Sequence, residues 1–409
     1  MSRLPRPRRL QCPAIVAMFL IVIAFIAAAV GCGSVPTRYV LMIIPTEDGE
    51  VSGPGEGNFF YNEGTVVNLQ AEADDGCYFV SWGGNVTTVA DTGSATTTIT
   101  MNGTYVIYAV FGLEVRDWYD LDAIRDNLYG SHTLMNDLDS TSPGYEELAG
   151  PAANEGKGWQ PLGTWSLSAF TGSFDGRGHE IRDLYMNRPN ESPVGLFGFT
   201  GTEGIVKDTR MADVLVTGYY YTGALVGYNN GIVTDSCSAG NVSGIVGMVG
   251  GLVGKNSGTV SSSYSTANTN GVVNAGGLVG DNWDGTVSNS YSTGTVIGFS
   301  CAGGLVAYNN RGTISNSYSG GTVTGSEHIG GLVGRNYDSN VGDSFWDTEA
   351  SGQGTSDGGT GQTTAELREL ATLLEAGWDI CAVTSGSTNS TCIWNIINGV
   401  TYPFLSWQS

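Results

Sequence analysis

Basic residues are scarce in this chain of 409 residues. Lysine and arginine together number 17, against 39 aspartates and glutamates, so the formal net charge at pH 7 is −22. A surface with this balance repels the phosphate backbone of nucleic acids and the headgroups of anionic lipids. The composition therefore argues against nucleic acid as a partner, and the same charge keeps an exposed, glycine-rich protein soluble.

Histidine and closely paired cysteines are also scarce, so common signals of metal chemistry are missing. The chain has 3 histidines, and none of its 7 cysteines stands in a C-x-x-C pair, the usual sign of a structural zinc site. His179-Glu180-Ile181-Arg182-Asp183 resembles the zincin motif H-E-x-x-H, but aspartate stands where the second histidine ligand is needed. We interpret His179 as a turn residue that follows Asp175-Gly176-Arg177-Gly178.

Between residues 195 and 345 the 3.6-residue period of amphipathic helices is missing, which excludes ankyrin and tetratricopeptide repeats. The segment instead holds six copies of an apolar tetrad framed by small residues, whose central leucines lie 26 to 29 residues apart. The copies begin at Gly195, Ala224, Gly251, Gly277, Gly304 and Gly331. Two further columns recur every 27 residues, an aliphatic one at Val206, Val233, Val260, Val287, Ile314 and Val341 and a mainly aromatic one at Cys237, Tyr264, Tyr291, Tyr318 and Phe345.

A fixed period of this length, made of short β-prone runs and Gly, Asn and Ser turns, indicates stacked β-units. One leucine per unit is too few for leucine-rich repeats, and propeller blades need about 40 residues. We therefore predict an all-β fold whose centre is a right-handed parallel β-helix solenoid of about six 27-residue coils. Equivalent residues then stack at roughly 4.8 Å, with the leucine, valine and tyrosine columns inside.

The residue midway between the valine and tyrosine columns decides how the strand runs there. Val287 and Tyr291 share a parity, so Asn289 would also point inward on a straight strand. An internal polar column must be hydrogen-bonded, whereas a bend or bulge removes that demand. We favour a strand corner at this column, which consists of Asp235, Ser262, Asn289, Asn316 and Asp343.

The repeated pattern G-G-L-V-G-x-N-x-G-T-V-S-N-S-Y-S resembles the GLUG repeat of bacterial and archaeal surface proteins. The resemblance covers roughly residues 190–347, and segments around 158–179 and 345–366 resemble those that precede and follow such repeats. It implies a solenoid of an adhesin-like protein. GLUG repeats also occur beside some immunoglobulin-A-cleaving metallopeptidases, but the family has no assigned catalytic residues to transfer.

Residues 38–112 form a separate unit with alternating, strand-like runs, for example Thr65 to Ala71 and Tyr105 to Phe111. Their layout resembles the internalin-type B-repeat, a small β-grasp-like module that serves as a stalk or spacer in surface proteins. Phe79 and Trp82 are then expected in its core, not on a ligand-binding surface.

The N-terminus predicts export. Four arginines precede an apolar run from Ile15 to Val30, as in a signal peptide covering residues 1–31. Ala29-Val30-Gly31-Cys32 resembles a bacterial lipobox, which implies an acylated Cys32 that anchors the protein to a membrane at the cell surface. An ordinary secretory signal, cleaved nearby, and an uncleaved anchor are the alternatives. Loss of residues 1–31 would leave 13 basic against 39 acidic side chains, a net charge of −26.

The remaining segments are expected to cap the solenoid. Residues 118–128 have a helical pattern that would cover an open edge of stacked strands, and residues 364–374 are a second short helix candidate. Cys381 and Cys392 bracket a small-residue loop and could form a disulfide. The predicted organisation is a signal peptide at 1–31, a linker at 32–37, the B-repeat-like module at 38–112, a leading cap at 113–190, GLUG repeats at 191–347 and a trailing cap at 348–409.

Four aromatic residues that follow the tetrads are candidates for a ligand-facing role: Tyr228, Trp283, Tyr308 and Tyr337. They could stack on sugar rings or could simply cover the coil ends. We expect no cofactor, although weak Ca²⁺ binding in loops such as Asp137 to Asp139 is conceivable without an EF-hand pattern.

These features predict a non-enzymatic, exported and lipid-anchored surface protein with a structural, adhesive or binding role. We expect a monomer whose partner is an unknown surface polymer or protein. The alternatives are a β-helix polysaccharide lyase or hydrolase, or a carbohydrate-binding surface protein. An enzyme is disfavoured because the basic residues of the coils form no recurring cluster. Lys255 and Arg335 each follow a tetrad, but Asp281 occupies the same position in a coil between them.

Overall fold

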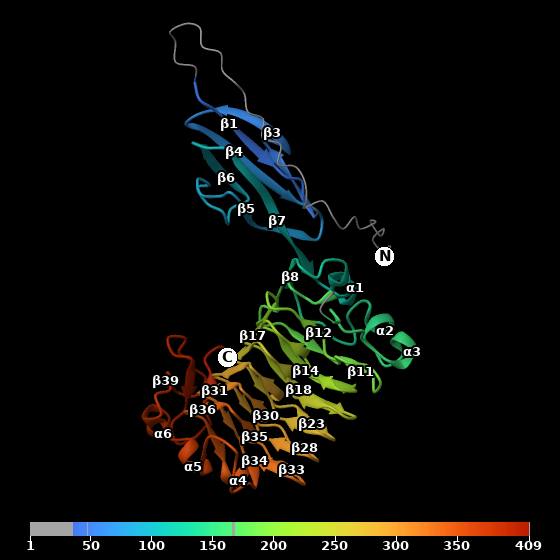
Figure 1. The fold of residues 1–409 in the computed structure, drawn as a ribbon, viewed down its shortest axis with the longest axis vertical. Helices are drawn as coiled ribbons and strands as arrows, with labels where there is room; N and C mark the ends of the chain where they lie inside the picture. Colours follow the sequence, from blue (N-terminus) through green and yellow to red (C-terminus); the bar gives the residue numbers. More distant parts are fainter. Residues whose placement is uncertain (1–35, 47, 166–167, 409) are drawn as a thin grey trace.

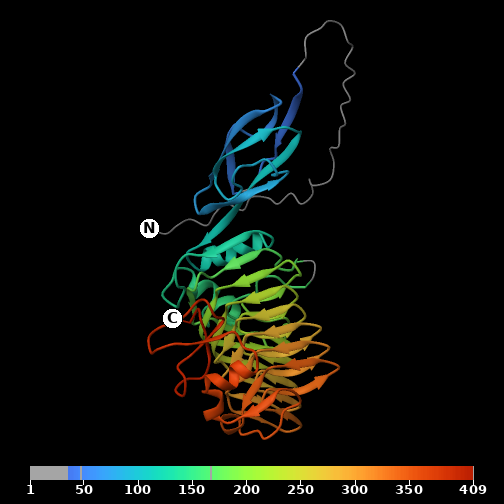
Figure 2. The same cartoon turned by 90° about the vertical axis from the view of Figure 1, so that its left-hand side faces the viewer.

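The computed structural model describes residues 36–408, except residues 47 and 166–167. The expected signal peptide and Cys32 therefore lie outside the described residues. Figure 1 shows a β-module followed by a solenoid, and Figure 2 shows the same arrangement from the side. The β-solenoid of about 6 turns of ~27 residues, preceded by a β-sheet domain, confirms the predicted fold class.

The N-terminal module consists of two sheets that enclose a core of their own. One sheet has the order β3-β1-β7-β5 and the other β2-β4-β6. The strands are β1 (Arg38–Ile43), β2 (Gly49–Gly53), β3 (Gly57–Asn62), β4 (Thr65–Ala73), β5 (Cys77–Gly84), β6 (Thr96–Met101) and β7 (Tyr105–Val115). Trp82 is buried with Leu69 and Ile99, and Phe79 packs against this cluster, as expected of core residues.

Strand β7 joins the module to the solenoid. Its last residues, Gly112 to Val115, pair in parallel with β8 (Ser131–Leu134), which in turn pairs with β9 (Ser173–Asp175). One continuous sheet therefore runs from the module into the first coil, across the expected boundary after residue 112. Backbone hydrogen bonds, and not only a chain connection, hold the two parts together.

The leading cap buries the apolar face of the predicted helix. This helix is α1 (Trp118–Ala123), extended by η1 (Ile124–Asp126), and Trp118, Leu121 and Ile124 belong to the solenoid core. Two one-turn helices complete the cap, α2 (Tyr145–Leu148) and α3 (Ala153–Gly156).

Each coil contributes strands to four parallel sheets. The valine sheet continues from β9 through β13 (Ile205–Lys207), β17 (Ile232–Thr234), β21 (Thr259–Ser261), β26 (Thr286–Ser288), β31 (Thr313–Ser315) and β36 (Asn340–Gly342). The asparagine sheet contains β12 (Phe197–Thr200), β16 (Val226–Asn229), β20 (Val253–Asn256), β25 (Val279–Trp283), β30 (Val306–Asn310) and β35 (Val333–Tyr337). The short-strand sheet contains β15 (Tyr221–Thr222), β19 (Met248–Gly250), β24 (Asn274–Gly276), β29 (Cys301–Gly303) and β34 (His328–Gly330).

The fourth, or tyrosine, sheet lies on the flank next to the C-terminal segment. It contains β10 (Glu180–Arg182), β11 (Tyr185–Asn187), β14 (Arg210–Gly218), β18 (Cys237–Gly244), β22 (Tyr264–Ser265), β23 (Asn268–Gly271), β27 (Tyr291–Ser292), β28 (Val296–Gly298), β32 (Tyr318–Ser319), β33 (Val323–Gly325), β37 (Phe345–Asp347) and β38 (Thr360–Gln362). The register confirms the 27-residue coil, since Val260 pairs with Val287 and Tyr264 with Tyr291.

The interior of the solenoid is built mainly from the leucine and valine columns, as predicted. Leu278 and Val287, like their equivalents in neighbouring coils, are fully buried in one continuous cluster. The expected corner is also present, because Asn289 has φ +49° and the equivalent Asp235 has the same value. Asn and Asp adopt this left-handed conformation more readily than most residues.

The predicted interior position of the tyrosine column is wrong. The left-handed corner changes the side that each following residue faces, so Ser290 and Ser292 are the buried residues near the coil interior. The tyrosine rings instead stack outside the main core, 4.8 Å apart between Tyr264 and Tyr291 and 4.9 Å between Tyr291 and Tyr318. They belong to a separate cluster with the C-terminal segment.

The C-terminal segment packs along this flank, where Figures 1 and 2 show it beside the coils. Its elements are α4 (Thr348–Ser351), α5 (Thr364–Leu367), α6 (Leu370–Glu375), β39 (Ile380–Ala382), β40 (Trp394–Ile396) and β41 (Phe404–Leu405). Trp394 contacts the rings of Tyr291 and Tyr318, and the Tyr318 hydroxyl donates to the carbonyl of Pro403 at 2.8 Å.

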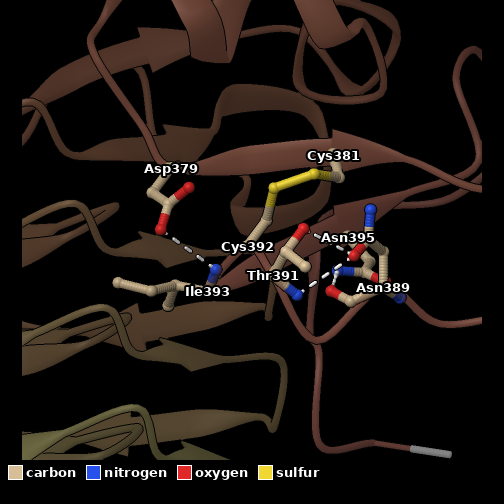
Figure 3. The surroundings of a disulfide bond; sticks show 7 residues. All are labelled: Asp379, Cys381, Asn389, Thr391, Cys392, Ile393 and Asn395. Atoms are coloured by element: carbon tan, nitrogen blue, oxygen red, sulfur yellow. Dashed lines mark hydrogen bonds between the residues drawn. A yellow bond between two sulfur atoms is a disulfide. The ribbon is translucent and has the colours of Figure 1, made fainter.

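A disulfide between Cys381 and Cys392 closes the loop between β39 and β40, with Cα atoms 5.8 Å apart. Figure 3 shows the bridge beside Asp379, whose carboxylate accepts a hydrogen bond from the Ile393 backbone. The bridge lies at the surface of the segment that covers the tyrosine column.

A candidate ligand-binding face on the solenoid

Two columns of side chains meet on one face of the solenoid, which we call the aromatic face. The first column lies in the asparagine sheet and contains Phe199, Tyr228, Lys255, Asp281, Tyr308 and Arg335. The second lies in the short-strand sheet and contains Tyr221, Met248, Asn274, Cys301 and His328. The columns are in contact, since the rings of Tyr221 and Tyr228 lie 5.3 Å apart.

An asparagine ladder holds the strands of this face in register. Asn256, Asn282 and Asn309 are fully buried, and each side-chain amide donates to the next asparagine oxygen at 2.8 Å. These residues alternate with Lys255, Asp281 and Tyr308, so the latter point away from the ladder. The sequence signal for this ladder is the asparagine that stands two residues after five of the six tetrads.

Lys255 lies at the centre of an aromatic cage formed by Tyr221, Tyr228 and Trp283. Its ammonium nitrogen is 5.6, 4.9 and 5.0 Å from the centroids of these rings. A cation at this distance is attracted by the negative face of each ring. The cage combines residues of three coils and two sheets, so it places the positive charge at a defined point of the surface.

The same arrangement recurs further along the face. The Arg335 guanidinium lies 5.6 Å from the Tyr308 ring, and Arg311 lies 5.3 Å from Trp283. Arg311 also forms a two-pronged ion pair with Asp284, with hydrogen bonds of 2.8 and 2.7 Å. The structure thus assembles three of the four predicted aromatic residues with cations.

The fourth predicted aromatic residue, Tyr337, ends β35 and is 56% exposed. Tyr337 pairs in register with Asn310, two residues along the strand from Arg335. Asn310 in turn pairs with Trp283, so Trp283 occupies the position of Tyr337 two coils earlier. Tyr337 therefore extends the aromatic face toward the last coil without taking part in the cage.

Asp281 is the unusual member of the first column. Its side chain is only 1% exposed, and neither carboxylate oxygen has a hydrogen-bond partner among the described residues. Burial raises its pKa to about 6, and the positive charge of Lys255 in the neighbouring coil limits the rise. A ligand that reaches this position would meet a carboxyl group whose charge changes in a mildly acidic range.

The other candidate sites do not form chemical clusters. His179 lies in the turn before β10, so no helix supports a metal-binding pair there, and it contacts Asp137 at 3.1 Å. The Asp139 carboxylate accepts hydrogen bonds from the backbone and side chain of Thr141. In the part of the chain that the structure describes, no group of three or more His, Cys, Asp or Glu residues could hold a metal ion.

Residues 36–408, apart from the internal gaps, contain no helix with the length and hydropathy needed to cross a membrane. Cys32, the candidate for lipidation, lies outside the described residues.

Comparison with known families supports both sequence resemblances. Residues 39–114 match the family of the divergent InlB B-repeat domain, and residues 271–297 match the GLUG motif. The chain carries a B-repeat domain and GLUG repeats. Together with the β-helix, these features are those of a surface repeat protein.

Two relatives resemble part of the chain. Halomucin of Haloquadratum walsbyi is 32% identical over 136 residues, which are 32% of this chain and 1% of halomucin. A protein of Evansella cellulosilytica, named as a Gly-rich membrane protein, is 33% identical over 123 residues, 28% of this chain and 13% of that protein. The matches thus span only a small part of either relative.

A solved structure from Bacteroides ovatus, a candidate immunoglobulin A1 protease, has a similar fold. The TM-score is 0.50 at 18% identity, and the alignment covers 74% of this chain and 93% of the other. At this identity the likeness concerns the fold.

Proposed function

We propose that this protein is exported, lipid-anchored at the cell surface through Cys32, and binds a glycan polymer along the aromatic face without catalysis. The observation that carries the proposal is the cage of Tyr221, Tyr228 and Trp283 around Lys255, continued by Tyr308 with Arg335. Rings and charged groups that recur along the coil axis suit a ligand that itself repeats. The names of the relatives, halomucin and a Gly-rich membrane protein, agree with a surface location.

The aromatic face lacks the pairing of acids that glycoside hydrolysis requires. Hydrolases of this kind use two carboxyl groups about 5–10 Å apart, one as acid and one as base or nucleophile. Asp281 is the one carboxylate in the two columns, and the nearby Asp284 is engaged by Arg311. Binding without bond cleavage is therefore the function that these side chains support best.

The B-repeat domain would act as a spacer between the membrane and the solenoid. Strand β7 hydrogen-bonds to both parts, so a pull or push on the domain is transmitted to the first coil. A rigid connection of this kind keeps the aromatic face at a set distance from the B-repeat domain.

Binding is tested with the chain that lacks residues 1–31 and carries Cys32→Ser, applied to a glycan array and to cell-wall polysaccharides. Trp283→Ala and Tyr308→Ala should each weaken binding at least tenfold, since each removes a ring from the face. Tyr129→Ala, which alters a ring that is 72% exposed elsewhere, is the matched control. Unchanged binding in both variants, or release of shortened or unsaturated sugars, would contradict the proposal.

Anchoring is tested separately in cells. Cys32→Ser in the full-length chain should move the protein from the membrane fraction to the soluble exported fraction. Retention of this variant in the membrane would point to an uncleaved anchor and would remove the lipid from the proposal, while leaving the binding function untouched.

A further inference from the structure

We infer that the polymer bound by the aromatic face is an acidic polysaccharide, whose carboxylates pair with Lys255 and Arg335. The inference rests on the proposed function of this face and names its ligand class. Three observations support it: the two cations form no ion pair among the described residues, each lies over an aromatic ring, and they are three coil steps apart.

The first argument is that these two cations lack ion-pair partners in the part of the chain that the structure describes. In the described residues Lys207, Arg188 and Arg311 are among the basic side chains that form ion pairs with nearby acids. Lys255 and Arg335 form no ion pair with any described residue, although acidic residues outnumber basic ones by more than two to one. Both sit over aromatic rings instead. Asp281 lies next to Lys255 in register and feels its charge, but the two form no ion pair, so each cation can still pair with an external anion.

The second argument distinguishes an acidic from a neutral ligand. A neutral sugar binds aromatic side chains by stacking on an open ring face. Tyr228, Trp283 and Tyr308 each have a cation over the ring, so a neutral sugar would have to displace it from that face. An anionic ligand can pair with the cation and leave the cation–π contact in place.

The third argument concerns the length of the ligand. Lys255 and Arg335 occupy the same register position three coil steps apart, roughly 14 Å at the usual strand spacing of about 4.8 Å. A single sugar does not bridge this separation, whereas an extended chain along the solenoid axis does. The ligand is therefore a polymer or an oligomer, not a monosaccharide.

Asp281 lies between these two cations and its charge opposes an acidic ligand. The titratable groups beside it are its register partners, Lys255 from β20 and Tyr308 from β30. Its charge also acts on Tyr221 from β15 and Cys301 from β29. Burial raises the pKa of Asp281 to about 6, and neither of its oxygens has a hydrogen-bond donor among the described residues. Asp281 therefore takes up a proton in a mildly acidic range, and the repulsion then disappears. Binding should consequently strengthen on acidification and Asp281→Asn should mimic the acidified state.

The test measures the affinity of the same soluble chain for polygalacturonate, alginate and hyaluronan, each beside its methyl-esterified form, in EDTA and about 0.15 M salt. At this ionic strength the general repulsion by the acidic surface is screened beyond about 8 Å. At least one acidic polymer should bind tenfold or more tightly than its ester. Lys255→Gln and Arg335→Gln should each weaken that binding roughly tenfold or more, whereas Lys207→Gln, which alters an ion-paired lysine on the valine sheet, should not.

The dependence on pH is measured in a His328→Gln background, which removes the imidazole of the second column. Affinity should rise about fivefold from pH 7.5 to pH 5, and Asp281→Asn should bind at pH 7.5 as the parent binds at pH 5. Thermal melting of every variant verifies that the solenoid is folded.

The outcomes separate this inference from the proposed function. Equal binding of acid and ester forms, with no effect of Lys255→Gln, would overturn the acidic ligand class, while loss of binding in Trp283→Ala would still support a glycan-binding face. If no acidic polymer binds but a neutral glycan of the array does, the inference is likewise overturned. If nothing on the array or in the panel binds, the proposed function itself fails.

Discussion

Asp281 illustrates how one side chain acquires unusual properties from its place in a column. Its register partners in the neighbouring coils are the longer side chains of Lys255 and Tyr308, and the shorter carboxylate between them is buried. A buried carboxylate without hydrogen-bond donors is costly when charged. The acid is therefore a destabilising feature of the folded chain at neutral pH, which agrees with a role in ligand binding.

This cost predicts a pH-dependent gain of stability for Asp281→Asn. The folded pKa of about 6 exceeds the ordinary value of 3.8, so the native state binds the proton more tightly and stability falls as pH rises from 3.8 to 6. Above that range the deficit is at most about 3 kcal/mol. Asp281→Asn should be about 1–3 kcal/mol more stable than the parent at pH 7.5 and nearly equal at pH 4, measured by urea unfolding. A variant that is less stable at pH 7.5 would contradict this.

At the scale of single elements, the tyrosine sheet and the C-terminal segment depend on one another. The Tyr318 ring is fully buried between Tyr291, Trp394 and Tyr402, and its hydroxyl satisfies the Pro403 carbonyl. The stacked rings would be an exposed apolar stripe without this cover. The C-terminal segment thus stabilises the solenoid by covering the tyrosine rings on its flank.

Tyr318→Ala should destabilise the protein by about 3–5 kcal/mol, as expected for removal of a large buried ring. It should also speed proteolysis within residues 363–408, because this segment loses its central contact. Tyr337→Ala removes a ring that is 56% exposed and should change stability by no more than about 0.5 kcal/mol. An equally stable Tyr318→Ala variant would show that the segment does not depend on the tyrosine column.

The asparagine ladder is the second element with a clear energetic role. Asn282 accepts from the Asn256 amide and donates to the Asn309 oxygen. Asn282→Ala therefore leaves the buried Asn309 oxygen without this donor, whereas the Asn256 amide keeps its bonds to the Gly258 and Thr286 carbonyls at 3.2 Å. A loss of about 1–3 kcal/mol is expected, mainly from the unpaired oxygen. Asn268→Ala, in an exposed asparagine contact of a neighbouring coil, is the control and should cost little. Thermal melting distinguishes the two variants.

At the scale of the whole molecule, the continuous sheet through β7 determines how the B-repeat domain and the solenoid move. Because β7 pairs with β5 of the domain and with β8 of the cap, bending between them would break backbone hydrogen bonds. This arrangement joins the B-repeat domain and the solenoid into one elongated body (Figure 1).

Small-angle X-ray scattering should therefore fit a single arrangement of the two parts in solution. Insertion of a flexible glycine–serine segment after Gly112 should broaden the distance distribution, since it interrupts the strand where it begins to pair with β8. Identical scattering of the parent and the insertion variant would mean that the connection is already flexible.

The amino-acid sequence by itself determined the period, the coil and the columns. The 27-residue spacing of Val260 and Val287 predicted their pairing, because stacked coils place equivalent residues next to each other. The corner at Asn289 was also predictable, since a polar residue at that parity needs either a partner or a bend. These features depend on local conformation and on repetition along the chain, both of which are visible in the sequence.

Only the tertiary structure decided which side of the coil the tyrosines face and what meets on the aromatic face. The corner reverses the parity after Asn289, and the C-terminal segment supplies the cover that makes an outward Tyr318 a buried one. The cage around Lys255 joins side chains from two sheets and three coils. The burial of Asp281 depends on side chains from neighbouring coils. Such contacts join residues of different coils and sheets that are far apart in the sequence, so the spacing of residues could not reveal them.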